Sequence, residues 1–426
     1  MRREPAVPKV GFGRETKGEQ VTERPIYVSG MATGVSDDPS PWKAGVQAGK
    51  AAVEKLAKAK PDFVYTITSS GYDLEPVVKG VLQSVGKDVP YVGIKTLGII
   101  FCENQFLPKG VLVAAVKSDA YKFAFSIGTN AHQNLHSALE KACLPVLDQH
   151  RARKAEGFEY LNLFFVMDSY TNGDVLVSEL SREVDKYDPN ISFYGGILDY
   201  AELSKECQLH VDNQAVNGGI FCMGIYSQNP PAIGYGHGLH PLVPKRATKV
   251  GGNIIYHLDD RPAFEVWKEF LVKKGISEAE IIKDPTQFLG RYQFGVPDPN
   301  FPKYPKVRIA VGITREGGIK LAGDVPENST VWLMEARKDQ MEEAVSQSIN
   351  ETFNLVDQRK PIGAIVVESI HRYLSLGNDF FSEVNMFQRK LAVPIVGFTT
   401  FAEFLRPRPE YKWFHNSSFE FQILVQ

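Results

Sequence analysis

Short runs rich in β-branched and aromatic residues alternate along the chain with segments expected to be helical. The run at 63–70 (FVYTITSS) is typical of a buried strand, and a helix is expected over 74–85. A strand-like segment follows at 89–100, and adjacent strands at 110–118 and 121–128 predict a hairpin. This mixture predicts an α/β (mixed α+β) protein with mixed sheets covered by helices, because a purely parallel sheet contains no hairpins.

The same order of elements returns twice. The second copy has a strand at 160–169, a helix at 174–187, a glycine-containing segment at 191–203, and paired strands at 218–227 and 232–238. The third copy has a strand at 362–369, a helix at 379–391, a glycine-containing segment at 393–405, and a final strand at 418–426. Self-similarity on this scale predicts an internal repeat of one strand–helix–strand–hairpin unit.

The length of the chain predicts two domains. Its 426 residues exceed the roughly 250–300 residues beyond which one core usually splits. We expect residues 1–24, which are charged and poor in large apolar residues, to form a loose leader, followed by domains at 25–245 and 246–426. The stretch 295–307 contains four prolines and is predicted to be an irregular connector, because proline supplies no donor to a sheet.

Composition and charge exclude several classes of function. A hydrophobic fraction of 43% with 23% charged residues is that of a globular protein, and a net charge of −2 without a long basic run argues against nucleic-acid binding. No run approaches the roughly 18 apolar residues of a membrane span, and the polar N-terminus lacks a signal-peptide core. We therefore expect a cytoplasmic protein without nucleic-acid or membrane partners.

The cysteines show no metal-ligand spacing, and no metal site is predicted. In a reducing compartment we expect ordinary, largely buried thiols rather than disulfides at Cys102, Cys143, Cys207 and Cys222.

Each copy of the repeat places glycine after residues typical of a strand: Gly93, the pair Gly195 and Gly196, and Gly397. Glycine permits positive φ or close backbone approach, so we expect strand-to-loop turns at these positions. Such turns often border small-molecule pockets, which makes the four glycines candidate ligand-binding residues. The alternative is a tight turn or bulge with no ligand.

Familiar catalytic motifs are absent: the chain has no G-x-S-x-G, P-loop, H-E-x-x-H or EF-hand loop. The GYGHG segment (234–238) lacks the spacing of a dinucleotide-binding loop, but it places His237 among glycines at a strand end. His415 precedes Asn416 at the start of the last strand. An imidazole can bind a carboxylate, transfer a proton or ligate a metal, and the alternative for each histidine is a structural hydrogen bond.

Charged residues near predicted strand ends are further candidates. Arg372 follows a strand that contains Glu368, and Glu403 lies in the third glycine segment. An arginine fork binds a carboxylate and a glutamate receives an ammonium group, which together suit a zwitterion such as an amino acid. The alternative is an ion pair between Arg372 and a neighbouring glutamate. Lys95 interrupts an apolar segment: a buried lysine there could act as base or nucleophile, whereas an outward-facing one would be solvated.

One segment resembles the join between the two domains of the FIST family. That family has a Gly-His-Gly strand end followed by the pattern G-N-x-x-Y-x-L-D-G-R-P-A-x-E-x-Y. The chain has GYGHG and then GNIIYHLDDRPAFEVW, with Asp260 in place of glycine and Trp267 in place of tyrosine.

The end of the chain carries the second resemblance. VPIVGFTTFAEF followed by HNSS is similar to the family's G-F-x-T-x-G-E segment and His-Asn, which Thr400, Glu403, His415 and Asn416 fit. FYGGILD resembles a Gly-Gly segment of the N-terminal domain, so the resemblance covers about residues 26–426. Two departures stand out: residues 94–99 (IKTLGI) replace the usual Cys-Ser-x-x-Gly-Glu, and Ser369 replaces a cysteine.

The resemblance implies an intracellular sensory module for a small polar ligand, an amino acid or related carboxylate, and we expect it to act alone or to signal through a separate partner protein. From the residue patterns and the resemblance together, the candidate ligand-binding residues are Gly93, Lys95, Gly195, Gly196, His237, Arg372, Gly397, Thr400, Glu403, His415 and Asn416. Two alternatives stay open. One is an enzyme at the same pocket, with Lys95 and His237 as catalytic candidates. The other is a haem-binding gas sensor with His237 or His415 as the axial ligand; otherwise no cofactor is expected.

Overall fold

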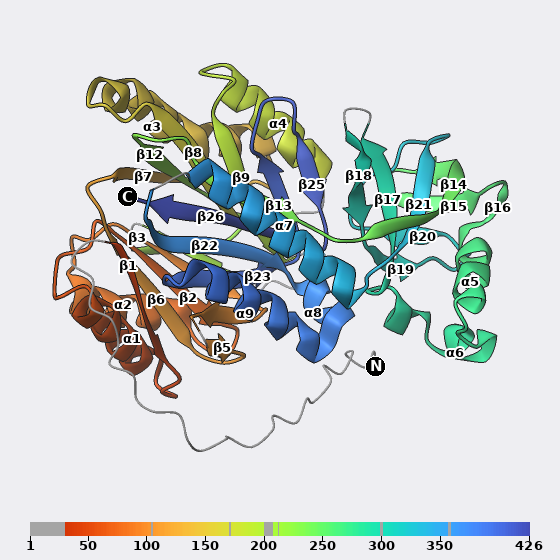
Figure 1. Cartoon of the computed structure of the whole chain (residues 1–426), viewed down its shortest axis with the longest axis horizontal. Helices are drawn as coiled ribbons and strands as arrows, with labels where there is room; N and C mark the ends of the chain where they lie inside the picture. The colour runs from red at the N-terminus through yellow and green to blue at the C-terminus, as the bar shows by residue number, and fades with distance from the viewer. Residues whose placement is uncertain are drawn as a thin grey trace.

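The computed structural model describes residues 30–103, 105–169, 172–199, 208–211, 213–298, 301–356 and 359–426. The predicted leader at 1–24 and Cys207 lie outside these residues. Three six-stranded mixed sheets surround a common core, and a fourth sheet stands beside them (Figure 1).

The first sheet has the strand order β1-β6-β2-β3-β10-β11 and is covered by helices α1 and α2. Its elements are β1 (Gly30–Ser36), α1 (Pro41–Lys55), β2 (Phe63–Ser69), α2 (Leu74–Val85), β3 (Tyr91–Thr96), β6 (Val111–Lys117), β10 (Gln208–Val211) and β11 (Gln214–Val216). Small residues let the two helices pack closely, because a Cβ on Gly45 would lie 2.1 Å from the Val77 carbonyl oxygen.

The second sheet has the order β7-β12-β8-β9-β24-β25 and is covered by α3 and α4. Its elements are β7 (Tyr121–Gly128), α3 (Leu135–Ala155), β8 (Tyr160–Ser169), α4 (Gly173–Asp185), β9 (Ser192–Asp199), β12 (Ile220–Ser227), β24 (Ala402–Arg406) and β25 (Trp413–His415).

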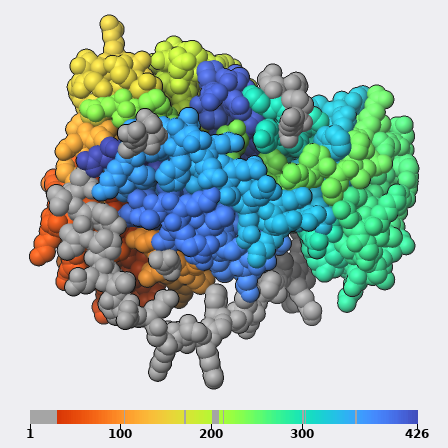
Figure 2. Space-filling model, viewed as in Figure 1, coloured from red at the N-terminus to blue at the C-terminus, as the bar shows by residue number. Residues whose placement is uncertain are grey.

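The third sheet has the order β13-β26-β22-β23-β4-β5 and is covered by α7, α8 and α9, which cross the front of the molecule in Figures 1 and 2. Its elements are β4 (Ile100–Cys102), β5 (Gln105–Leu107), β13 (Ala232–Gly236), α7 (Lys338–Val356), β22 (Pro361–Ser369), α8 (Ile370–Leu376), η2 (Gly377–Asp379), α9 (Phe380–Leu391), β23 (Ile395–Thr400) and β26 (Phe419–Val425).

The three sheets share one plan. Each contains a parallel pair, β2 with β3, β8 with β9, or β22 with β23, and each pair is flanked by antiparallel strands. Beyond the second parallel strand lies a hairpin that follows the equivalent strand of another sheet: β10–β11 follows β9, β24–β25 follows β23, and β4–β5 follows β3. This cyclic exchange interleaves the two halves of the sequence, because β24 and β25 complete a sheet whose other strands precede residue 228.

The core lies where the three sheets face one another. One apolar cluster contains Tyr65 of the first sheet, Phe164 of the second and Val367 of the third, all at most 1% exposed. Separate apolar clusters lie between each sheet and its helices. The predicted burial of the cysteines is confirmed for Cys102, Cys143 and Cys222.

The fourth sheet forms the right-hand part of the molecule in Figure 1. Its order is β18-β17-β21-β14-β15-β20-β19, with β16 paired to β15. Its elements are β14 (His240–Gly251), β15 (Ile254–Leu258), β16 (Arg261–Pro262), α5 (Ala263–Lys273), α6 (Glu278–Lys283), η1 (Pro285–Phe288), β17 (Tyr292–Asp298), β18 (Phe301–Arg308), β19 (Ala310–Ile313), β20 (Ile319–Leu321) and β21 (Thr330–Glu335).

The prediction of an irregular connector at 295–307 was wrong, because most of this stretch belongs to β17 and β18. Strand β18 is at the edge of the sheet, and β17 pairs with β21 only over 292–295. Proline is tolerated at an edge or beyond a ladder, since no donor is required there.

Candidate functional site

The four candidate glycines lie inside strands β3, β9 and β23, so the prediction of strand-to-loop turns was wrong. The absence of a side chain at these glycines lets atoms of neighbouring elements approach the strand backbone closely. A Cβ on Gly397 would lie 2.0 Å from the Phe101 ring of the exchanged hairpin, and one on Gly195 would lie 2.1 Å from the Phe165 carbonyl oxygen. A Cβ on Gly93 would crowd Val78 and the exchanged residue His210, and one on Gly196 would crowd Thr400. These glycines hold strands and hairpins together.

Lys95 lies on the outer, helix-covered side of β3, since it alternates with Ile94 of the central core. It is only partly buried and sits opposite Thr68 and Gln208 in the sheet. It is not among the described residues that line the cavity built below around His237. The structure therefore separates the two catalytic candidates of the enzyme hypothesis.

The Gly-His-Gly segment passes directly over helix α7. Gly238 has φ +68°, and a Cβ there would lie 2.4 Å from the Met341 Cα, so both the conformation and the space require glycine. Arg372 donates from Nη1 to the His237 carbonyl oxygen at 2.8 Å. Backbone packing and one buried cation thus hold His237 in place.

His237 and His415 are 178 positions apart in the chain (415 − 237) but adjacent in space, with ring centroids 5.7 Å apart. The Leu239 N–H donates to Nδ1 of His237 at 3.0 Å, and the Val307 N–H donates to Nδ1 of His415 at 3.3 Å. A nitrogen that accepts a hydrogen bond carries no proton, so each neutral ring is protonated at Nε2. Within the described part of the chain, the buried Nε2 of His237 has no partner.

Both rings are held neutral. Burial lowers the pKa of His237 to about 3, and the nearby charges of Arg372 and His240 act in the same direction. Burial lowers the pKa of His415 well below its usual range, with His237, Arg308 and Lys306 adding to the effect. At neutral pH each ring is therefore an uncharged N–H donor.

These two rings, together with the exposed His240, border a cavity of about 320 Å³, which we call the two-histidine cavity after the pair of facing rings. Tyr235, Tyr304 and Trp413 supply aromatic surface, and Ser418 supplies a hydroxyl group. Helix α7 forms one wall with Gln340, Glu343, Ala344, Gln347, Ser348 and Glu351. None of the described lining residues is a lysine or arginine. The cavity thus combines neutral donors, aromatic surface and acidic residues on one helix.

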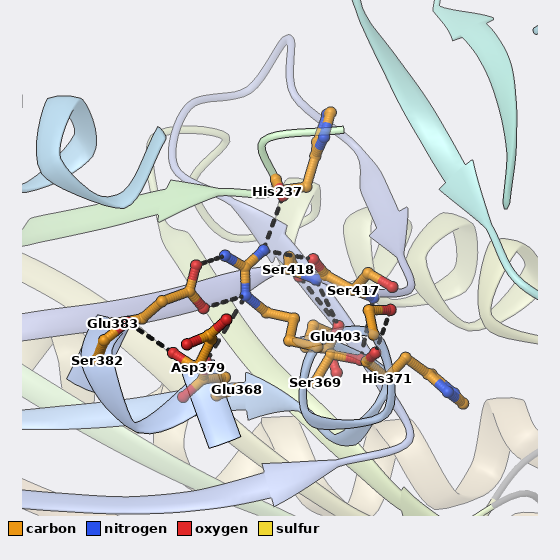
Figure 3. A network of polar contacts seen from close by, with 12 residues as sticks. His237, Glu368, Ser369, His371, Asp379, Ser382, Glu383, Glu403, Ser417 and Ser418 are labelled. Atoms are coloured by element: carbon orange, nitrogen blue, oxygen red, sulfur yellow. Dashed lines mark hydrogen bonds and ion pairs between the residues drawn. The ribbon is translucent and has the colours of Figure 1, made fainter. Parts of the chain in front are cut away.

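Arg372 lies beneath this cavity, fully buried, at the centre of a polar network (Figure 3). Its Nε and Nη2 donate to the two carboxylate oxygens of Glu383 at 3.0 and 2.5 Å, and Nη1 donates to the Ser417 carbonyl oxygen at 2.9 Å. Glu368 lies 3.6 Å from Nε. The ion-pair alternative therefore describes Arg372, whose guanidinium also bonds the carbonyl oxygens of His237 and Ser417.

Glu383 was missed by the sequence reasoning. A signal was present, because Glu383 interrupts the apolar face of α9 formed by Phe380, Val384, Phe387 and Leu391. A charged residue at such a position requires a buried partner.

Glu403 is also fully buried in the network. Its Oε1 accepts from Thr400 Oγ1 at 2.7 Å, and its Oε2 accepts from the Ser418 N–H at 3.2 Å and Oγ at 3.0 Å. Burial raises the pKa of Glu403 to about 8, although the hydrogen bonds from Thr400 and Ser418 oppose the shift. Burial also raises the pKa of Glu368 and Glu420 well above the usual range. Glu403 is therefore largely protonated at neutral pH.

Asn416 anchors the turn between β25 and β26. It is fully buried, and its Oδ1 accepts from the Ile309 N–H at 3.3 Å. Its own backbone N–H donates to the Val307 carbonyl oxygen at 3.3 Å. Asn416 thereby fixes His415 and Ser418 on either side of it.

The lining of the two-histidine cavity does not suit haem. The imidazole Nε2 atoms have the chemistry of axial ligands, but haem also carries two propionate groups that need cationic partners. The described lining contains Glu343 and Glu351 and no lysine or arginine. Within the described residues, no cluster of three or more His, Cys, Asp or Glu is arranged to hold a metal ion.

The chain was compared with curated protein sequences and with solved structures. A search of curated protein sequences finds no match. Two solved structures are similar at low levels: T. maritima PurL complexed with ADP (9% identity, 94% of this chain and 74% of that chain, TM-score 0.22) and PurLQS from Thermotoga maritima (10%, 93% and 72%, TM-score 0.20). Such TM-scores do not establish a common fold.

None of the helices that the structure describes is long and apolar enough to cross a membrane.

Residues 62–261 match the FIST N domain, and residues 263–406 match the FIST C domain. FIST domains are associated with small-ligand sensing in signalling proteins. Both domains are present, in order and over most of the sequence, so the chain belongs to the FIST family.

Proposed function

We propose that this protein is a small-ligand sensor whose ligand binds in the two-histidine cavity. The observation that carries the proposal is the convergence of His237 and His415, each with Nδ1 occupied by a backbone N–H and therefore protonated at Nε2. Two fixed donors on neighbouring rings suit one carbonyl or carboxylate group of a ligand.

The remaining lining restricts the ligand further. Glu343 and Glu351 on α7 would attract an ammonium group, and Trp413 with Tyr235 would contact an apolar or aromatic portion. Phosphate esters are disfavoured, because the described lining has no lysine or arginine to balance their charge. An amino acid or a related amino-carboxylate satisfies the three parts of the cavity together.

The first experiment is a thermal-shift screen of the twenty amino acids and short carboxylates. A compound that binds only the folded protein should add about 2.7 kcal/mol of stability at 100 times its Kd. Isothermal titration calorimetry then gives the stoichiometry. If no compound of either class raises the melting temperature, the proposed ligand class is wrong.

Matched variants test the site. His237→Phe and His415→Phe keep an aromatic ring but remove the Nε2 donor, and each should weaken binding about ten- to a hundredfold, the range for hydrogen bonds to a charged group. His257→Phe is the control, since His257 on β15 does not line the cavity. Wild-type affinity in both cavity variants would place the ligand elsewhere.

A further inference from the structure

A second cavity lies at the carboxyl ends of the parallel strands β3, β9 and β23. It has a volume of about 840 Å³ and is bordered by Gly98, Leu198 and Thr399, which follow or end these three strands. Helix α8 borders it on another side, and η1 and β19 of the fourth-sheet region complete the lining. We call it the strand-end cavity. Ligands of open α/β sheets commonly bind beyond the carboxyl ends of strands.

The lining of this cavity is mainly apolar. Its larger apolar side chains include Leu198, Leu289, Ile309, Val311, Leu374 and Phe401. Asp199 is an acidic residue in the lining, and no lysine or arginine occurs among the described lining residues. An anionic ligand would therefore be buried against mainly apolar walls, with no cationic side chain among the described lining residues to pair with it. The volume is within the range of small-molecule pockets, about 300–1,000 Å³.

His371 supplies a polar group in this apolar setting. It is 5% exposed, and its ring meets the Phe401 ring edge-on at 4.8 Å between centroids. Within the described residues, neither Nδ1 nor Nε2 makes a hydrogen bond of ordinary geometry. Burial lowers the pKa of His371 to about 3, although a hydrogen bond with the Phe401 backbone, outside the ordinary geometry, opposes the shift. The ring is thus neutral, with one donor and one acceptor.

We propose that the strand-end cavity is a second binding site, for a neutral, mainly apolar molecule whose single hydroxyl or carbonyl group bonds to His371. The apolar walls match the body of such a molecule. A hydroxyl can donate to one ring nitrogen or accept from the other, and a carbonyl can accept, because a neutral imidazole adopts either tautomer. Leaving a buried imidazole without a partner is unfavourable, so a ligand that satisfies it gains specificity as well as affinity.

The site is separate from the two-histidine cavity. The two share none of their described lining residues, and His237 and His371 extend from the buried network in different directions (Figure 3). The proposal therefore stands or falls independently of the amino-carboxylate ligand proposed above.

Nile red, a neutral dye with one carbonyl group, is a suitable probe for the full-length protein. Its fluorescence should rise on binding, and 1-octanol should displace it. Octanoate at pH 8 has the same chain length but carries a negative charge, so it should compete at least tenfold more weakly. Equal competition by octanoate and 1-octanol would overturn the proposed ligand class.

Substitutions locate the dye. Leu374 is 62% exposed at the cavity, so Leu374→Arg should fold normally and reduce Nile red affinity at least tenfold. Ile282→Arg is the matched control, because Ile282 is 61% exposed on α6 and does not line the cavity. His371→Phe should lower the affinity for 1-octanol about three- to tenfold, as expected for the loss of one hydrogen bond. His371→Gln, which keeps a donor and an acceptor, should bind 1-octanol nearly as well as the wild type. Unchanged binding in Leu374→Arg would overturn the proposal.

Discussion

The two cavities differ in how their histidines are held. His237 and His415 each have Nδ1 occupied by a backbone N–H, so their tautomers are fixed and both rings are donors. His371 has no such partner within the described residues, so its ring can donate or accept. The first arrangement is preorganised for one kind of ligand group, whereas the second is adaptable. The two proposals thus assign the same residue type, held neutral by burial in both places, to two modes of recognition.

A second difference is charge. Acidic residues on α7 line the two-histidine cavity, and the Arg372 network lies beneath it, whereas the strand-end cavity is mostly apolar. Glu403 lies between them: Thr400 lines the strand-end cavity and Ser418 lines the two-histidine cavity, and both hydroxyls donate to its carboxyl group. The following predictions test how far the two sites are independent.

The largest effect is expected for Arg372→Met. It leaves Glu383 and Glu368 buried without their cation, so the free energy of unfolding should fall by about 3–5 kcal/mol. It also removes the donor to the His237 carbonyl oxygen, so ligand binding in the two-histidine cavity should fall more than Nile red binding. Urea denaturation and the two binding assays measure this.

Arg337→Met is the control for this substitution. Arg337 pairs with Asp339 on the surface, and the side chain is 53% exposed, so its removal should change stability by less than about 1 kcal/mol. If both variants lose the same free energy of unfolding, the buried Arg372 network stabilises the protein no more than a surface ion pair does.

Glu403→Gln should change how the free energy of unfolding depends on pH, because it replaces the buried carboxyl group by an amide that does not titrate. The folded-state pKa of Glu403 is about 8, above its ordinary value, so the proton stabilises the folded protein below about pH 4.5 and this contribution is lost as pH rises through 8. Between pH 5 and 8.5 the wild type should therefore lose about 2–4 kcal/mol relative to Glu403→Gln. Parallel stability curves of the two proteins from urea titrations would contradict the shifted pKa.

Gly238→Ala tests the backbone beneath the two-histidine cavity. The residue has φ +68°, and the new methyl group would overlap the Met341 Cα, so destabilisation of about 2–4 kcal/mol is expected with loss of ligand binding. Gly252→Ala is the control, since Gly252 has φ +61° but open space around it and should lose only about 1 kcal/mol. Similar losses in both would mean that α7 moves aside.

The smallest expected effect is the pH dependence of ligand affinity. A carboxylate bound to His237 raises that ring's pKa from about 3, so the bound state takes up protons and affinity should increase severalfold as pH falls from 7 to 5. Nile red, which is neutral, should bind equally at both pH values. Calorimetry in buffers of different ionisation enthalpy measures the proton uptake. If no protons are taken up on binding, the ligand is uncharged.

Much of the local structure follows from the sequence. The helix at Leu74–Val85 and the strands at Tyr121–Gly128 and Tyr160–Ser169 coincide with the predicted segments, because their patterns depend on near neighbours. The predicted hairpin of 110–118 with 121–128 and the predicted pairing of 218–227 with 232–238 were wrong, because in each case the two strands belong to different sheets. Helix α8 (Ile370–Leu376) was not predicted. Such a short helix depends on packing more than on local pattern.

The candidate site was predicted in part. His237 and His415 were named, and they line one cavity with Ser418, which was not named. Arg372 and Glu403 were named as ligand contacts, but their donors and acceptors are taken by Glu383, Thr400 and Ser418. Residue type indicates which chemistry is available, whereas only the neighbours decide whether it is already used.

The sequence by itself determined the mixed α/β class, the strand–helix order and the FIST resemblance, since these follow from local patterns and short motifs. Only the tertiary structure decided that hairpins β4–β5, β10–β11 and β24–β25 exchange among the three sheets. The same packing brought His237 to His415 and separated both from Lys95 and the glycines. The physical reason is that such contacts join residues far apart in the chain, and their geometry depends on the packing of the whole core.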